Sequence, residues 1–159
     1  MKDVFDAAIN EIKNNRNFVI STVTRTQGST PQKPGAKLLV REDGSGVGTL
    51  GGGCVEGDIW FASSEKIKRE ESAEVRPYEL NEDLAAKDGL VCGGTMHFMI
   101  DPIDNKLEFE FFLDEIKKAY NGDKPVALVQ VLESKKKEEI SKKILIKEDG
   151  SKSGQLISE

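Results

Sequence analysis

A cysteine flanked by glycines is the residue best suited to chemistry in this sequence. Cys54 follows Gly51-Gly52-Gly53 and precedes a segment expected to be helical. Unpaired amides and the positive end of the helix dipole should converge there, an arrangement that suits a bound anion and favours the thiolate over the thiol. The glycines would also let a ligand approach bare backbone. The alternative is a buried, inert cysteine in a tight turn.

Two further features accompany Cys54. Glu56, in the first turn of the expected helix, is the natural proton acceptor or hydrogen-bonding partner, although a carboxylate there also complements the helix dipole. A second loop, Cys92-Gly93-Gly94, again places one sulfur beside two glycines. Cys92 follows Cys54 by 38 residues, unlike the Cys-x-x-Cys pairs of structural zinc sites, so we do not expect zinc.

His97 is the single histidine of the sequence. On the expected strand it shares a face with Thr95, Met99 and Asp101, which predicts a satisfied polar-face residue rather than a base or a ligand. An enzyme that uses Cys54 as its nucleophile would therefore lack a convincing histidine partner, and we rank that function last.

The composition describes a small acidic protein. The 159 residues carry a net charge of −5 and 37% of them are hydrophobic, which suits one globular domain over residues 1–159. An acidic balance argues against non-specific binding of nucleic acid or anionic lipid. No apolar run approaches the roughly 18 residues that a membrane span needs. Two cysteines cannot build a disulfide scaffold, so we expect a cytoplasmic protein.

Hydrophobic periodicity predicts an α/β or α+β protein, a mixed β-sheet with helices packed on it. Helices are expected over residues 3–15, 55–71 and 108–120, with a short one over 81–86. The expected strands span residues 18–24, 37–41, 47–50, 73–80, 95–101 and 126–132. Residues 25–36 hold two prolines and two glycines, which exclude a regular element and mark a long, shaped loop.

The end of the chain is similar to its beginning. Lys37–Gly44 matches Lys143–Gly150 at a constant offset, and the preceding helix and strand match with a small gap. We therefore predict a degenerate internal repeat of a helix–strand–loop–hairpin unit, residues 3–53 and 108–158. The second copy has no glycine or proline in the loop, so the chemistry should belong to the first copy.

Four motifs carry a resemblance to a known family. They are Gly28-Ser29-Thr30-Pro31, Lys33-Pro34-Gly35-Ala36-Lys37, Gly51-Gly52-Gly53-Cys54-Val55-Glu56-Gly57 and Cys92-Gly93-Gly94-Thr95. Together they resemble the XdhC/CoxI family, the maturation factors of molybdenum hydroxylases such as xanthine dehydrogenase. The resemblance covers roughly residues 1–103, which correspond to an N-terminal domain. Typical members continue into a Rossmann-like domain, for which this sequence has no room.

The resemblance implies a chaperone for the molybdenum cofactor. Such a protein would bind molybdopterin, protect it while a separate cysteine desulfurase exchanges an oxo ligand for sulfur, and deliver it to the apo-hydroxylase. Amides at Gly51–Cys54 and the cation of Lys37 would suit the terminal phosphate. A thiolate at Cys54 or Cys92 would ligate molybdenum or carry sulfur. The implied cofactor-binding residues are Gly28, Ser29, Thr30, Lys37, Gly51, Gly52, Gly53, Cys54, Glu56, Cys92, Gly93 and Gly94.

An alternative of another class is an interaction module that docks on the hydroxylase, or on a full-length paralogue, without binding cofactor. The short chain and the altered second loop favour this module. The two glycine-flanked thiols favour the carrier, because a docking surface has no need of them. In both cases we expect an accessory factor rather than an enzyme, without nucleic-acid or membrane partners. An exposed sheet edge would also allow a homodimer, which the sequence does not demand.

Overall fold

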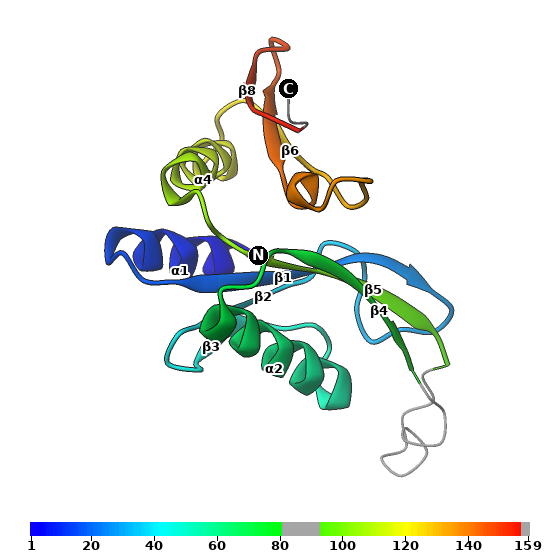
Figure 1. Ribbon diagram of the computed structural model, residues 1–159. Helices are drawn as coiled ribbons and strands as arrows, with labels where there is room; N and C mark the ends of the chain where they lie inside the picture. Colours follow the sequence, from blue (N-terminus) through cyan, green and yellow to red (C-terminus); the bar gives the residue numbers. More distant parts are fainter. Residues whose placement is uncertain (81–92, 157–159) are drawn as a thin grey trace.

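The computed structural model describes residues 1–80 and 93–156 and arranges their strands in two antiparallel sheets (Figure 1). Sheet A has the strand order β3-β2-β1-β5-β4, and sheet B has the order β6-β7-β8. In chain order the elements are α1 (Lys2–Lys13), β1 (Phe18–Gln27), β2 (Lys37–Arg41), β3 (Gly46–Gly48), α2 (Gly53–Arg69), β4 (Glu74–Glu79), β5 (Thr95–Pro102), α4 (Lys106–Tyr120), β6 (Val126–Gln130), the 3-10 turn η1 (Lys137–Glu139), β7 (Lys143–Lys147) and β8 (Lys152–Gly154).

The middle strand of sheet A carries apolar side chains on both faces. Val19 and Val23 join the core beneath α2, whereas Phe18 and Ile20 join the core beneath α1 and α4. Successive side chains of a strand alternate between faces, so a strand of this kind needs a covering layer on each side. The helices α1 and α2 supply these layers, one on each face of the sheet (Figure 1).

A buried ion pair fastens α1 to sheet A. Glu11 is 1% exposed, and its carboxylate accepts hydrogen bonds from Arg16 Nε at 2.6 Å and from Arg41 Nε of β2 at 2.9 Å. The hydrogen bond from Arg16 outweighs the cost of burial and, together with Arg41, lowers the pKa of Glu11 below its ordinary value. The position of the helix on the sheet therefore depends on a charged group that must stay paired.

The second part of the chain repeats the helix and hairpin order of the first. The pairing Leu38↔Gly48 of β2 and β3 has its counterpart in Ile144↔Gly154 of β7 and β8. Gly48 and Gly154 have φ values of +100° and +98°, and a Cβ at either would strike a carbonyl oxygen of the neighbouring strand. The helices α1 and α4, which precede the two hairpins, pack against each other. The two units are thus built alike.

A polar cluster joins the second unit to sheet A. Asp101 of β5, only 4% exposed, accepts hydrogen bonds from Gln130 Nε2 at 2.8 Å and from Ser141 Oγ. It also forms an ion pair with Lys143 Nζ at 2.7 Å. Lys37, which matches Lys143 in the repeat, also interacts electrostatically with Asp101. The Asp101 carboxylate therefore interacts with one lysine from each hairpin. A buried charge such as this one is stable only while it stays paired.

The α+β class expected from the sequence is confirmed, but the strands form two antiparallel sheets rather than one mixed sheet. The reason lies in β5, the strand that leads into α4. It is hydrogen-bonded by β1 on one edge and by β4 on the other, so later strands cannot pair beside it. The helix expected over residues 81–86 lies outside the described residues, and the single-domain organisation stays a prediction.

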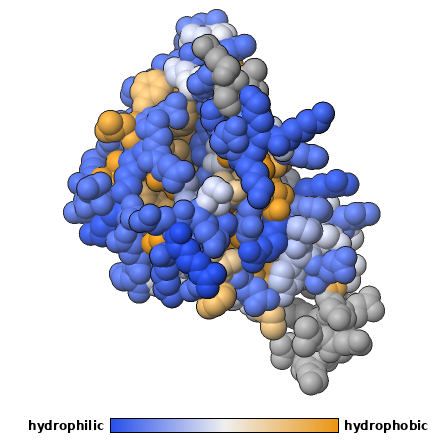
Figure 2. All heavy atoms as spheres, viewed as in Figure 1, coloured by the Kyte–Doolittle hydropathy of each residue, from blue (hydrophilic) through white to orange (hydrophobic). Residues whose placement is uncertain are grey.

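The surface of the protein is mainly hydrophilic on the side that Figure 2 shows, with hydrophobic side chains in small, separate patches. Among the described residues, no helix combines the length and the apolar character that crossing a membrane requires.

Replacing Glu11 by Gln should destabilise the fold by about 1–3 kcal/mol. This is less than for a fully buried pair, because Arg16 and Arg41 keep partial access to solvent. Since the pKa of Glu11 is lowered in the folded state, its stabilisation is present above about pH 4.3 and is lost as the pH falls through the folded-state value. Urea unfolding from pH 7 to pH 3 measures both effects. The exposed Glu133→Gln variant is the control, and an equal loss in both variants would contradict the assignment.

Candidate functional site

Three of the sequence motifs meet at one end of sheet A. Gly28 follows β1 and packs on the two glycines before β5, so that a Cβ on Gly28 would lie 3.0 Å from the Gly93 carbonyl oxygen. A Cβ on Gly94 would lie 2.5 Å from a carbonyl oxygen at the end of β1. Pro31 packs on Gly51, where a Cβ would lie 2.7 Å from the proline ring. We call this contact the glycine junction, and only glycine fits there because any side chain would collide with backbone or ring.

The carboxylate of Glu56 orders the turn that leads from the glycine junction into α2. Its Oε2 accepts hydrogen bonds from Thr49 Oγ1 at 2.6 Å, from the Leu50 amide at 2.7 Å and from the Gly52 amide at 3.1 Å. The Gly51 amide donates to Thr49 Oγ1 at 3.1 Å. Glu56 is therefore engaged in shaping the turn rather than standing free to accept a proton.

The electrostatics of this turn follow from those hydrogen bonds. Burial opposes the ionisation of Glu56, but the bonds from Thr49 and the loop amides outweigh it and hold the pKa of Glu56 below its ordinary value. Its negative charge compensates the positive end of α2. Of the four amides expected to bind an anion, those of Gly51 and Gly52 already donate to Thr49 and Glu56. Within the described residues, the amides of Gly53 and Cys54 have no acceptor outside the helix and are left for a ligand.

Cys54 presents its sulfur to solvent from the first turn of α2. The alternative of a cysteine buried in a tight turn is therefore wrong. The backbone around it is open as well, since a Cβ placed on Gly52, Gly53 or Gly57 would meet no heavy atom within 4 Å. A reagent or ligand can thus reach the thiol and the adjoining backbone from outside.

A tyrosine and an aspartate near Cys54 were not singled out from the sequence. Tyr78 of β4 donates its hydroxyl hydrogen to Asp58 Oδ2 at 2.7 Å. Burial, the hydrogen bond to Asp58 and the charges of Asp58 and Cys54 raise the pKa of Tyr78 to about 12, so the phenol stays protonated. Asp58 lies one turn after Cys54 on α2, and that spacing could have indicated it. Tyr78 is placed by strand register, for which the sequence carries no local signal.

Of the other predicted residues, Ser29 and Thr30 lie in the loop after β1 and Lys37 lies on β2. Ser29 is exposed, and Thr30 is half-buried with its Oγ1 donating to the Gln32 carbonyl at 3.0 Å. Lys37 points away from α2, and its Nζ donates to Thr22 Oγ1 at 2.9 Å. Burial lowers the pKa of Lys37, although the nearby Asp101 opposes the shift. The structure does not bring Lys37 to Cys54.

His97 also faces away from Cys54. Its neighbours Met96 and Phe98 belong to the core beneath α2, so alternation directs His97 to the opposite face, as the sequence predicts. Cys92 lies outside the described residues. Within the described ranges, no group of three or more His, Cys, Asp or Glu side chains could hold a metal ion.

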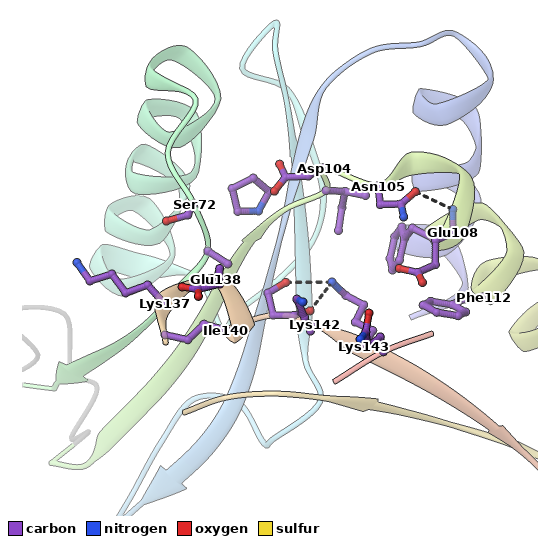
Figure 3. Close-up of a pocket in the computed structure, with 16 residues that line it drawn as sticks. Ser72, Asp104, Asn105, Glu108, Phe112, Lys137, Glu138, Ile140, Lys142 and Lys143 are labelled. Carbon is purple, nitrogen blue, oxygen red and sulfur yellow. Dashed lines mark hydrogen bonds between the residues drawn. The ribbon is translucent and has the colours of Figure 1, made fainter. Parts of the chain in front are cut away.

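A cavity of about 500 Å³ lies between α4, the second hairpin unit and the end of β5 (Figure 3). Charged side chains make up much of its wall, among them Asp104, Glu108, Lys142 and Lys143. Burial and the charge of Asp101 raise the pKa of Asp104. None of the predicted site residues lines this cavity. The candidate site is therefore the open surface around Cys54.

Comparison with known proteins finds a family model that matches part of the chain. Residues 12–78 match the model of the XdhC and CoxI family, which covers the chain from the end of α1 to β4 and includes the loop after β1 and the start of α2. The chain is 27% identical over 118 residues to a Bacillus subtilis strain 168 protein whose name describes a probable xanthine dehydrogenase subunit, covering 73% of this chain and 35% of that protein.

Two further relatives extend this comparison. An uncharacterized protein of Escherichia coli strain K12 is 33% identical over 98 residues, which are 62% of this chain and 18% of that protein. A crystal structure described as a xanthine dehydrogenase from Bacillus halodurans superposes with a TM-score of 0.69 and 25% identity, covering 96% of this chain and 46% of the other. The chain thus spans less than half the length of each of these relatives.

Replacing Gly94 by Ala should open the glycine junction. The added methyl group would lie 2.5 Å from a carbonyl oxygen, and we expect a loss of about 1–3 kcal/mol in the free energy of unfolding. The control is Gly57→Ala in α2, where a Cβ meets nothing within 4 Å and alanine favours the helix. Chemical denaturation of both variants measures the difference. If the two variants unfold at the same denaturant concentration, the close approach at Gly94 is refuted.

Proposed function

The chain belongs to the XdhC and CoxI family through residues 12–78, and on that premise we propose that it serves in the maturation of a molybdenum hydroxylase by carrying molybdopterin on the surface around Cys54. The observation that carries the proposal is the exposed sulfur of Cys54 at the open, glycine-lined start of α2. A cysteine retained for packing would be buried, whereas an ordered turn holds this one out to solvent.

The chemistry of the surface suits such a cargo. Thiolate sulfur can ligate the molybdenum of such a cofactor, and the exposed Cys54 offers one. The bare backbone of Gly52 and Gly53 lets a flat pterin ring approach closely. Because the charge of Glu56 offsets the dipole of α2, contact with the sulfur should contribute more to binding than an anion cradle.

The residues around the sulfur act as positioning groups in this proposal. Glu56 holds the turn through three hydrogen bonds to its Oε2, and the Tyr78–Asp58 hydrogen bond ties β4 to α2. Both contacts keep the start of α2 in one place, so that binding of the cargo would require little reordering. Such preorganisation is what a protein that receives and releases a labile cofactor needs.

The partners in this proposal follow from the family. Cargo delivery needs an apo-hydroxylase of the xanthine dehydrogenase type, a choice supported by the name of the Bacillus subtilis relative. The sulfur for cofactor sulfuration would come from a separate cysteine desulfurase. The interaction module remains the alternative. It differs from the carrier in one measurable respect, the presence of bound pterin.

Protein purified from a host that makes molybdenum cofactor should retain pterin, measured by fluorescence after oxidation. Cys54→Ser should lower the retained pterin by about tenfold or more, because loss of even a group that only orients a metal's ligands lowers metal affinity by roughly 10- to 100-fold. His97→Gln is the matched control, because His97 lies on the opposite face of sheet A and should leave retention unchanged. Wild-type and Cys54→Ser proteins with equal pterin would refute the role of the sulfur. A protein without pterin that still binds the apo-hydroxylase would be the interaction module instead.

A further inference from the structure

Four aliphatic side chains lie on the outer face of sheet B, namely Ala127, Val129, Ile144 and Ile146, and Lys152 of β8 lies beside them. In the register of β6 and β7, Ala127 pairs with Ile146 and Val129 pairs with Ile144. The intervening Leu128 and Leu145 belong to the core beneath α4, so these four side chains point to the opposite face. Val129 is 39% exposed, and no helix of the described chain packs on this face (Figure 1). The outer face of sheet B is thus apolar and uncovered by any described helix.

The internal repeat shows what covers the matching face of sheet A. In sheet A, the pairs that correspond to Ala127–Ile146 and Val129–Ile144 are Val19–Val40 and Ser21–Leu38 of β1 and β2. Their exposed fraction is 0%. They lie beneath α2, which contributes Val55, Ile59 and Ala62 to the same core. The described residues of the second unit include the hairpin but no counterpart of α2.

We propose that the outer face of sheet B is a docking surface for an amphipathic α-helix of a partner polypeptide, which takes the position that α2 takes on sheet A. The driving force is removal of aliphatic surface from water on both sides of the contact. Recognition of this kind uses apolar residues spaced along one helix face. In α2 they are Val55, Ile59 and Ala62, and the partner helix needs the same spacing.

One difference between the two units specifies the charge of that helix. In sheet A, Gly46 makes room for Trp60 of α2, since a Cβ on Gly46 would lie 2.7 Å from the indole ring. The matching position in β8 is Lys152, which pairs with Ile146 as Gly46 pairs with Val40. A lysine there excludes tryptophan and attracts a carboxylate. The partner helix therefore carries an acidic residue at the position that corresponds to Trp60.

This docking surface is separate from the surface around Cys54 and shares no residue with it. The inference rests on the repeat and on the register of β6, β7 and β8, and it does not depend on pterin binding.

The test uses the full chain and a labelled peptide with the sequence of residues 50–71 that carries Cys54→Ser and Trp60→Glu. The peptide is stapled across its exposed side so that it is helical before binding. Fluorescence anisotropy should show saturable binding. Val129→Lys in the protein should weaken it by about tenfold or more, because a charge would be buried in the apolar contact. The matched control is Leu107→Lys on α4, where the leucine is 81% exposed and binding should be unchanged.

A charge exchange provides a second readout if Val129→Lys impairs folding. Lys152→Glu in the protein should weaken binding of the Trp60→Glu peptide and should favour a peptide with Trp60→Lys. Binding that ignores both Val129→Lys and the charge exchange would overturn the proposal, as would the lack of saturable binding by a monomeric protein. A dimer in light scattering that Val129→Lys dissociates, without peptide binding, would also overturn it, because a second copy would then cover the face.

Discussion

A strand with apolar side chains on both faces must be covered on both sides, and this requirement arranges sheet A and the helices packed on it. The central strand β1 directs Phe18 and Ile20 to α1 and Val19 and Val23 to α2. Once α2 lies on the sheet, its first turn comes next to the loop that follows β1. The exposed position of Cys54 is therefore a consequence of how sheet A is buried. No separate pocket is needed to position Cys54, because Cys54 belongs to α2, the helix that covers one face of sheet A.

The main role of the glycine-rich motifs in this structure is to allow close backbone contacts and an ordered turn before α2. At the glycine junction, backbones approach so closely that a methyl group on Gly94 would collide with a carbonyl oxygen. Glu56, in turn, accepts three hydrogen bonds with one carboxylate oxygen and thereby orders the turn before α2. Its charge also reduces the electropositive field expected at the helix start. What remains for a ligand is an exposed sulfur on a well-ordered, open backbone.

The two units of the internal repeat share one framework but differ in the surfaces that they expose. Both have a helix followed by a hairpin with the same register, and the Asp101 carboxylate links their lysines. The first unit also has the proline- and glycine-rich loop and α2, which together build the surface around Cys54. The second unit has neither among the described residues, and its sheet keeps an apolar outer face. We infer a carrier surface on the first unit and a docking surface on the second.

Local patterns in the sequence determined the three long helices and the hairpins, because each depends on residues close together in the chain. The helical periodicity of residues 3–15 and the turn at Asp43-Gly44 are of this kind, and α1 and the β2–β3 hairpin follow them. These patterns left open whether Cys54 is buried or exposed, and the structure places it in solvent. Only the tertiary structure decided that Lys37 lies on the face opposite Cys54, that Tyr78 stands beside Asp58, and that the strands form two sheets. These features depend on pairing between strands distant in sequence, where a shift of one residue would move every side chain to the other face.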